Sequence, residues 1–336
     1  MPTNRQWRLA ARPKGEPKPS DFKWTEEAAP KAGPGQVLLR TLWLSLDPYM
    51  RGRMNEGKSY AAAANLGDVM VGGTVSQVVE SQVPKFKPGQ IVVGFSGWQD
   101  YQAAAPMGLM PLDPKELPIT TALGVCGMPG VTAHVGLLDI GKPKAGETVV
   151  VSAASGAVGA TVGQIAKIKG CRAIGIAGGK DKCDWVVKEA GFDACVDYKA
   201  GDVFRQLKDA CPKGIDVYFD NVGGDILEAC LRLLNTFARI PLCGMISRYN
   251  DDGSAPGYKN LLSLLSNRAM IQGFIVSDHM DRWPGALKEL RGWVKEGRIK
   301  YRETVSNGLE SAPDAFIGLL RGKNFGKQLV KVADPN

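Results

Sequence analysis

Short apolar runs separated by glycine and proline dominate the first third of the chain. Residues 35–46, 67–81 and 89–106 mix alternating and continuous apolar positions, and a Gly/Pro-containing turn bounds each run. This pattern is typical of β-strands joined by tight turns. We therefore expect a β-rich, barrel-like domain in this part of the chain.

From about Gly127 the pattern changes to strand-like runs that alternate with helical ones. Such alternation predicts a parallel sheet with helices on both faces. The predicted helices are Gly156–Lys169, Cys183–Ala190, Val203–Ala210 and Ile226–Leu234, and the predicted strands include 148–154, 172–178, 194–198, 215–222 and 238–246.

The C-terminal tail returns to the pattern of the first third. Residues 311–332 predict a helix, a glycine stop and a short strand. We expect a discontinuous domain made of residues 1–126 and 301–336, with a second domain, 127–300, inserted between them. The fold class is α/β.

The turn after the strand 148–152 has the character of a diphosphate-binding loop. Gly156 and Gly159 are three residues apart, and apolar residues at helical spacing follow them. Gly156 lets the backbone approach a pyrophosphate, Gly159 allows the helix to pack close to the strand, and the helix N-terminus offers free N–H groups. Ala154 replaces the first glycine of GxGxxG, so the position between a strand and a helix carries the prediction of dinucleotide binding.

The end of the next strand indicates which dinucleotide is bound. NAD sites usually place a carboxylate there, which binds the ribose 2′-hydroxyl. Here the chain reads Gly178-Gly179-Lys180-Asp181-Lys182, with room for a 2′-phosphate and two lysines to neutralise it. We expect NADP(H), although Lys180 also fits a solvated helix start.

Composition and charge exclude several other classes of protein. The net charge of +8 is spread along the chain without a basic run or nucleic-acid motif, so we expect no nucleic-acid partner. The chain has no apolar run of membrane-spanning length and no signal-peptide pattern, so we expect a cytoplasmic protein. Seven cysteines without a CxxC pair fit a reduced compartment, and two isolated histidines argue against a zinc site.

Several long motifs in order resemble the zinc-independent branch of the medium-chain dehydrogenase/reductases, which includes prostaglandin, alkenal and curcumin reductases. The motifs cover most of the chain and include LSLDPYMRGRM, LGVCGMPGVTAHVGLLDIG, AASGAVGATVGQIAKIKGCR, DVYFDNVGG and GKNFGKQLVKV. The resemblance implies a GroES-like β-rich domain plus a doubly wound Rossmann domain. It also implies NADPH-dependent reduction of a carbon–carbon double bond conjugated to a carbonyl, with an enone or alkenal as substrate. A homodimer is expected because relatives commonly extend their sheet across two subunits.

The resemblance also assigns roles to individual residues. Gly156, Ala157, Val158 and Gly159 cradle the pyrophosphate, and Lys182 and Tyr198 hold the 2′-phosphate. The remaining expected cofactor contacts are Asn221 near the centre, Cys243, Gly244, Ser247 and Tyr249 along the nicotinamide half, Phe274, Ile275 and Val276 beside them, and Asn324 from the tail.

The reaction needs a hydrogen-bond donor to the carbonyl oxygen, on which charge builds as hydride reaches the β-carbon. Tyr249 is the first candidate, Tyr49 the second and Tyr60 the third; each also fits a packing or pocket-lining role. Solvent or the nicotinamide ribose can share the task. Two alternatives stay open: a quinone-type oxidoreductase with the same cofactor, and a protein that binds NADPH without catalysis.

Overall fold

The computed structural model describes residues 2–336, which form two compact units. The β unit joins the residues up to Leu123 with Glu303–Asn336, and the α/β unit is Gly124–Arg302. The expected boundaries, after residue 126 and before residue 301, lie within a few residues of these positions. Each unit has its own sheet and its own core.

The β unit is built around a sheet of seven strands. The order is β14-β15-β3-β4-β5-β7, with β6 paired to β3, and β1 and β2 form a separate antiparallel ribbon. Its elements are β1 (Thr3–Leu9), β2 (Phe22–Ala28), β3 (Val37–Ser45), α1 (Tyr49–Arg53), β4 (Thr74–Ser81), β5 (Ile91–Gly94), β6 (Tyr101–Ala104), β7 (Met110–Leu112), β14 (Glu303–Asn307), α9 (Ala312–Leu320) and β15 (Lys327–Lys331), with short 3₁₀ turns at Pro19–Asp21, Ile119–Leu123 and Leu309–Ser311.

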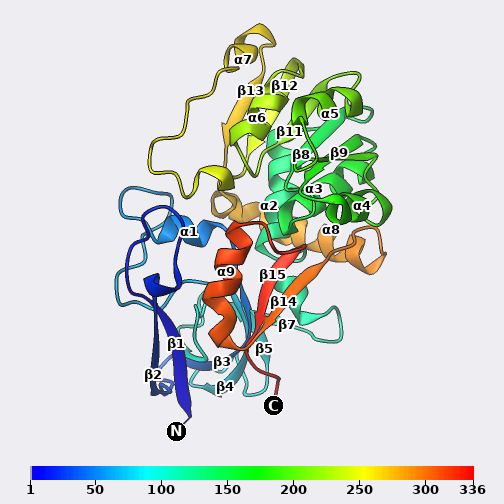
Figure 1. The fold of residues 1–336 in the computed structure, drawn as a ribbon. Coiled ribbons are helices and arrows are strands. Elements are labelled where there is room, and N and C mark those ends of the chain that lie inside the picture. Colours follow the sequence, from blue (N-terminus) through cyan, green and yellow to red (C-terminus); the bar gives the residue numbers. More distant parts are fainter. Residues whose placement is uncertain (1) are drawn as a thin grey trace. The chain divides into compact units, whose positions relative to one another are not determined.

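The C-terminal tail is an integral part of the β unit. Strand β15 pairs antiparallel with β3, with Leu329 opposite Ser45, and Figure 1 shows the red β15 beside the blue β3. Phe316 of α9 packs edge-on against Phe22 and Trp98, with ring centroids 6.4 Å and 5.7 Å away. All three rings are buried. Aromatic burial of this size explains why the chain returns to its first domain.

The α/β unit contains one parallel sheet of six strands. Its order is β10-β9-β8-β11-β12-β13, the doubly wound arrangement 3-2-1-4-5-6, in which the strand order reverses between β8 and β11. The elements are α2 (Met128–Val135), a π turn (Gly136–Gly141), β8 (Thr148–Ser152), α3 (Ala157–Ile168), β9 (Arg172–Ala177), α4 (Lys180–Lys188), β10 (Ala194–Asp197), α5 (Val203–Ala210), β11 (Ile215–Phe219), α6 (Gly224–Leu231), β12 (Leu234–Leu242), a 3₁₀ turn (Ile246–Arg248), α7 (Leu262–Ser266), β13 (Met270–Gly273), a 3₁₀ stretch (Val276–Arg282) and α8 (Trp283–Lys295).

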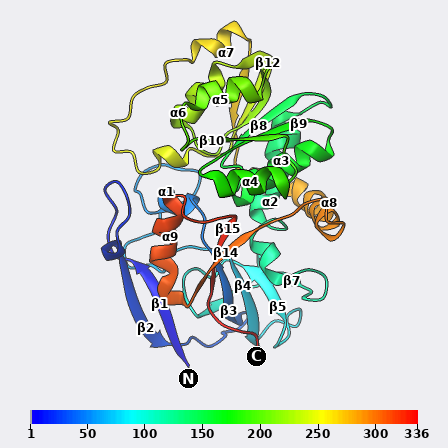
Figure 2. The same cartoon turned by 45° about the vertical axis from the view of Figure 1, so that its right-hand side comes forward.

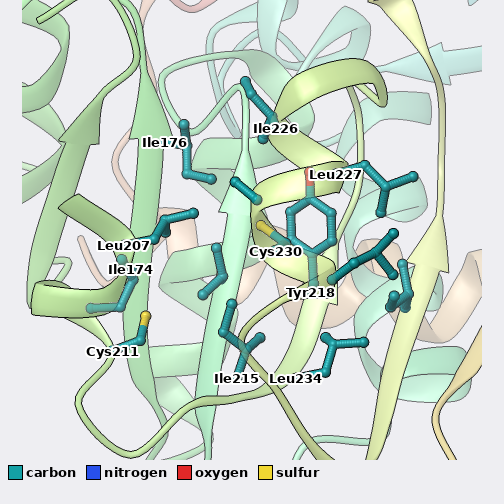
Figure 3. Packing of buried hydrophobic residues seen from close by; sticks show 14 of the residues in the cluster. Ile174, Ile176, Leu207, Cys211, Ile215, Tyr218, Ile226, Leu227, Cys230 and Leu234 are labelled. Carbon is teal, nitrogen blue, oxygen red and sulfur yellow. The ribbon is translucent and has the colours of Figure 1, made fainter. Parts of the chain in front are cut away.

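Helices cover this sheet on both faces (Figure 2). On one face, α5 and α6 bury apolar side chains against the strands; Leu207 and Leu227 pack with Ile174 and Ile176 in the cluster that Figure 3 shows. Helix α3 packs against β8 and β9. Within residues 2–336, no helix combines the length and apolar character that a bilayer crossing needs.

Several predicted element boundaries in the α/β unit were wrong. The strand predicted over 238–246 runs instead from Leu234 to Leu242. Helix α4 begins at Lys180 rather than at Cys183, because Gly179 at φ +100° leads the chain directly into the helix. Helix α6 ends at Leu231, and the apolar run that we read as its last turn starts β12 at Leu234. Leu234 pairs with Ile215 in the parallel sheet, so strand pairing decides a run that periodicity leaves ambiguous.

Candidate dinucleotide-binding site

The turn after β8 leads into the N-terminus of α3 and leaves it without a side-chain cap. Ala153 lies in the left-handed region, at φ +52°, and Gly156 is the extended N-cap residue of α3, which receives no side-chain cap. The first N–H groups of α3, from Ala157 to Gly159, therefore remain available to an anion. A Cβ added to Gly159 lies 2.3 Å from the carbonyl oxygen of Ala153, so only glycine lets helix and turn approach this closely. The cradle fits a pyrophosphate.

The turns after β8 and β11 meet at the switch point of the sheet. Asn221 follows β11, and its backbone N–H donates to Ser152 Oγ at 2.8 Å. Its Nδ2 donates to the carbonyl oxygen of Ser152, also at 2.8 Å. Ligands of doubly wound sheets bind at such a crevice. The predicted centre of the site, Asn221, is thus held beside the predicted pyrophosphate turn.

Cationic and aromatic side chains gather where β9 and β10 end. Lys182 lies on α4 and is half-buried, whereas Tyr198 and Lys199 follow β10 and are exposed. Lys199 Nζ lies 5.9 Å from the centroid of the Tyr198 ring. A Cβ added to Gly178 lies 2.6 Å from the Tyr198 hydroxyl, so the small residue that we expected to make room for phosphate makes room for this ring.

The positive charges of Lys182 and Lys199 repel each other. Burial lowers the pKa of Lys182, and the positive charge of Lys199 lowers this pKa further. Like charges held together favour a multiply charged anion, and a 2′-phosphate carries such a charge. Sequence reasoning missed Lys199; the available signal was a basic residue directly after the third strand of the fold.

Lys180 does not belong to this cationic pair. Its Nζ binds Asp184 one turn along α4, at 2.6 Å, and its side chain is 79% exposed. The solvated helix start, which we left open for Lys180, describes its place in the structure.

The segment after β12 is held against the turn after β11. The N–H of Ser247 donates to the carbonyl oxygen of Val222 at 3.1 Å, and its hydroxyl donates to the same oxygen at 2.6 Å. Tyr249 follows the short 3₁₀ turn; its hydroxyl lies 2.8 Å from the position of a Cβ added to Gly244. Burial raises the pKa of Cys243 to about 12, so this thiol is neutral near pH 7.

The predicted residues after β13 divide between core and surface. Phe274 is buried, with its ring 6.1 Å from that of Phe219 in an edge-to-face contact. Ile275 and Val276 are half-buried. The Phe274 side chain therefore belongs to the core, and Ile275 and Val276 are the members of this group with accessible side chains.

Three further candidates belong to the β unit. Tyr49 begins α1, and its hydroxyl is buried without a hydrogen-bond partner in the described chain. Burial and the nearby Asp47 raise its pKa well above the usual value. Tyr60 is 60% exposed, and Asn324 Nδ2 donates to the carbonyl oxygen of Gly326 at 2.7 Å. Their roles toward the cofactor stay predictions.

No cluster of three or more His, Cys, Asp or Glu side chains suited to a metal ion occurs among residues 2–336. The cysteines of this range are all free thiols.

The strand order, the glycine turn at the switch point and the lysine pair define a dinucleotide-binding protein of the Rossmann class. Two family models match the chain: "N-terminal domain of oxidoreductase" over residues 5–112 and "Zinc-binding dehydrogenase" over residues 157–292.

Full-length relatives agree with this class. The NADPH-dependent curcumin reductase of Escherichia coli (strain K12) is 52% identical over 335 residues, which are 98% of this chain and 97% of that protein. The NADP(+)-dependent 2-alkenal reductase of Nicotiana tabacum is 43% identical, over 95% of this chain and 94% of that protein. The crystal structure of CurA from Vibrio vulnificus in complex with NADPH superposes with a TM-score of 0.94 at 49% identity, and covers 98% of this chain and 100% of that chain. The chain belongs to the medium-chain dehydrogenase/reductase family, in the group that contains these reductases.

Proposed function

We propose that this protein is an NADPH-dependent oxidoreductase that reduces the carbon–carbon double bond of α,β-unsaturated ketones and aldehydes. The observation that carries the proposal is the similarity to the curcumin reductase, 52% identity over nearly the whole of both chains. The glycine turn supports a dinucleotide cofactor, and the lysine pair supports the choice of NADPH on independent grounds.

NADP(H), when bound, supplies the hydride for this chemistry. The α3 N-terminus, with Gly156, Ala157, Val158 and Gly159, binds the pyrophosphate. Lys182 and Tyr198 bind the 2′-phosphate, with Lys199 as an added cation. The nicotinamide half is assigned to Asn221, Cys243, Gly244, Ser247, Tyr249, Ile275 and Val276, together with the backbone of Phe274, while Asn324 stays a prediction from the resemblance.

Tyr249 is the proposed hydrogen-bond donor to the substrate carbonyl oxygen. It lies on the segment that the turn after β11 holds in place, so its position is defined by backbone contacts. A positioned donor stabilises the charge that develops on this oxygen as the double bond accepts hydride. Tyr49 and Tyr60 remain the second and third candidates.

Tyr249→Phe tests this assignment. Where the hydroxyl is the main donor, we expect kcat for an enone to fall by about 10²–10³, a much larger effect than the change in the dissociation constant for NADPH. Stopped-flow reduction and cofactor titration measure the two quantities. A fall of less than about threefold would move the role to another donor.

The function itself is tested by NADPH oxidation at 340 nm with a small enone, an aryl enone and a quinone, each repeated with NADH. We expect a saturated ketone, rather than an alcohol, from both enones, and a strong preference for NADPH. Turnover of the quinone alone would support a quinone-type oxidoreductase. Binding of NADPH without turnover of any substrate would support a non-catalytic role.

We further propose that the protein is a homodimer in which strand β13 pairs with its copy. All four residues of β13 are exposed, and the strand forms one edge of the parallel sheet. Such an edge readily accepts another strand. Light scattering should give twice the mass of the 36.0 kDa chain; a mass of one chain at micromolar concentration contradicts this. Cytoplasmic location and zinc independence stay predictions.

A further inference from the structure

A carboxyl group lies buried at the switch point and takes no part in the assignments above. Asp220 directly follows β11 and has no exposed surface. Its Oδ1 accepts four hydrogen bonds: from Tyr218 Oη at 2.7 Å, from Ser152 Oγ at 3.1 Å, and from the backbone N–H groups of Val222 and Gly223, both at 2.9 Å. Its Oδ2 has no partner within the described residues.

These bonds join segments that are distant in the sequence. Ser152 ends β8, whereas Val222 and Gly223 form the turn that opens α6. Ser152 Oγ donates to Asp220 and in turn accepts the N–H of Asn221 at 2.8 Å. The carboxyl group therefore fixes Asn221 through the hydroxyl that both residues share.

The backbone of Asp220 extends the same connection to β12. Its carbonyl oxygen accepts the N–H groups of Cys243 and Gly244, at 2.9 Å and 3.1 Å. The carbonyl oxygens of Asn221 and Val222 accept the N–H groups of Ile246 and Ser247, at 3.2 Å and 3.1 Å. The shape of the turn after β11 thus sets the place of the segment that carries Tyr249.

Holding a turn with a buried carboxyl group has a desolvation cost. Burial raises the pKa of Asp220, and the N–H and hydroxyl donors oppose that rise. All these donors converge on one oxygen, and charge-assisted bonds of this kind are stronger and more directional than neutral ones. Packing alone does not require this arrangement, since an apolar side chain avoids the desolvation cost.

We propose that Asp220 is a positioning residue for NADP(H): its carboxylate joins the ends of β8 and β11 so that Asn221 and the 243–249 segment meet the cofactor in one fixed arrangement. This inference rests on the proposed function. It predicts that cofactor affinity depends on the Asp220 carboxylate although Asp220 need not touch the cofactor.

Asp216 supplies a matched control on the same strand. It lies near the start of β11, at the opposite end from the switch point, and its carboxylate accepts from the Thr148 N–H and from Asn235 Nδ2, each at 2.8 Å. Asp220→Asn and Asp216→Asn make the same chemical change. Only the first change touches the proposed arrangement.

NADPH titration by fluorescence, together with thermal unfolding, tests the inference on the full-length protein. We expect Asp220→Asn to weaken NADPH binding about tenfold, which corresponds to ~1.4 kcal/mol, and Asp216→Asn to leave it unchanged. Tyr218→Phe removes one donor with little loss of volume and should weaken NADPH binding less, in the same direction. In steady-state kinetics, KM for NADPH should rise in Asp220→Asn while KM for the enone stays constant.

Wild-type affinity in both Asp220→Asn and Tyr218→Phe would overturn the inference, even if both variants lose thermal stability. Equal losses of affinity in Asp216→Asn and Asp220→Asn would overturn it too, since the effect would then be general to the strand. A wild-type protein that binds NADPH but reduces no enone would overturn the proposed function alone, because the dissociation constants still report on Asp220. If Asp220→Asn fails to fold, Tyr218→Phe against Asp216→Asn gives the same comparison.

Discussion

Lys182→Ala is expected to weaken NADPH binding by ~2 kcal/mol, about thirtyfold, and to leave NADH binding nearly unchanged. The cofactors differ only in the 2′-phosphate, and Lys182 is the half-buried cation near the end of β9. Removing it costs the charge-assisted contact with that phosphate. Titration of each cofactor measures the change in preference directly.

Lys180→Ala provides the control for this prediction. Lys180 lies on the same helix two residues earlier, but it is exposed and binds Asp184. We expect its removal to change the affinity for neither cofactor. An equal loss of NADPH affinity in Lys180→Ala would show that general positive charge, rather than the place of Lys182, selects NADPH.

The affinity for NADPH should also depend on pH through the ionisation of Lys182. The pKa of Lys182 is lowered from 10.5, chiefly by burial and then by Lys199. NADPH affinity should therefore decline as pH rises through this lowered pKa, because the ammonium is lost, and Lys182→Ala should flatten the decline. Without cofactor the sign is opposite: the unfolded chain holds the proton more tightly, so Lys182 makes the free energy of unfolding rise with pH between its lowered pKa and 10.5. A parallel decline of both quantities would contradict the assignment.

Gly159→Ala is expected to weaken NADPH binding by more than about a hundredfold, because it deforms the anion cradle itself. The added Cβ lies 2.3 Å from the Ala153 carbonyl oxygen and 3.0 Å from that of Ser152, and both are backbone atoms that no rotamer change can move. Ala153 is already at φ +52°, so the turn has little freedom to adjust. The α3 N-terminus must shift, and its N–H groups lose their common focus.

Gly292→Ala separates this effect from a general response to replacing a helical glycine. Gly292 lies within α8, and an added Cβ meets nothing within 4 Å. Alanine is favoured over glycine in helices by up to ~1 kcal/mol, so this variant should be as stable as the parent or more so, with unchanged NADPH affinity. Wild-type NADPH affinity in Gly159→Ala would mean that the pyrophosphate does not bind at this turn.

Local patterns in the chain were sufficient to predict many of the helices, strands and turns. The helix Val203–Ala210 was predicted, from the alternation of strand-like and helical runs, with the bounds that the structure shows. In the structure the Asp202 side chain caps this helix by accepting the N–H groups of Phe204 and Arg205. The turn around Gly156 was predicted because a buried strand, small residues and an amphipathic helix follow one another within 22 residues. The family was recognised from the resemblance of several motifs to those of known proteins. Such a resemblance indicates a fold but gives no physical reason for it.

Other features depend on contacts between distant segments. The end of α6 was misplaced because Leu234 belongs to a strand that only pairing with Ile215 defines. Lys199 was not predicted as a site residue, because its expected role depends on its closeness to Lys182. The two lysines are 17 positions apart in the chain but near each other in space. The absence of a side chain at Gly178 was predicted to make room for the 2′-phosphate. In the structure, the Tyr198 ring fills the space that a side chain at this position would need.

The sequence by itself determined the two-part organisation, the parallel sheet, the dinucleotide turn and the expectation of NADPH, because each of these is written in residues close together along the chain. Only the tertiary structure decided that Lys182 and Lys199 act as a pair and that Asp220 joins β8, β11 and the segment after β12. Hydrogen bonds and charges act over a few ångströms of space, and parallel strands bring together ends that the chain separates by more than 60 residues, as for Ser152 and Asp220.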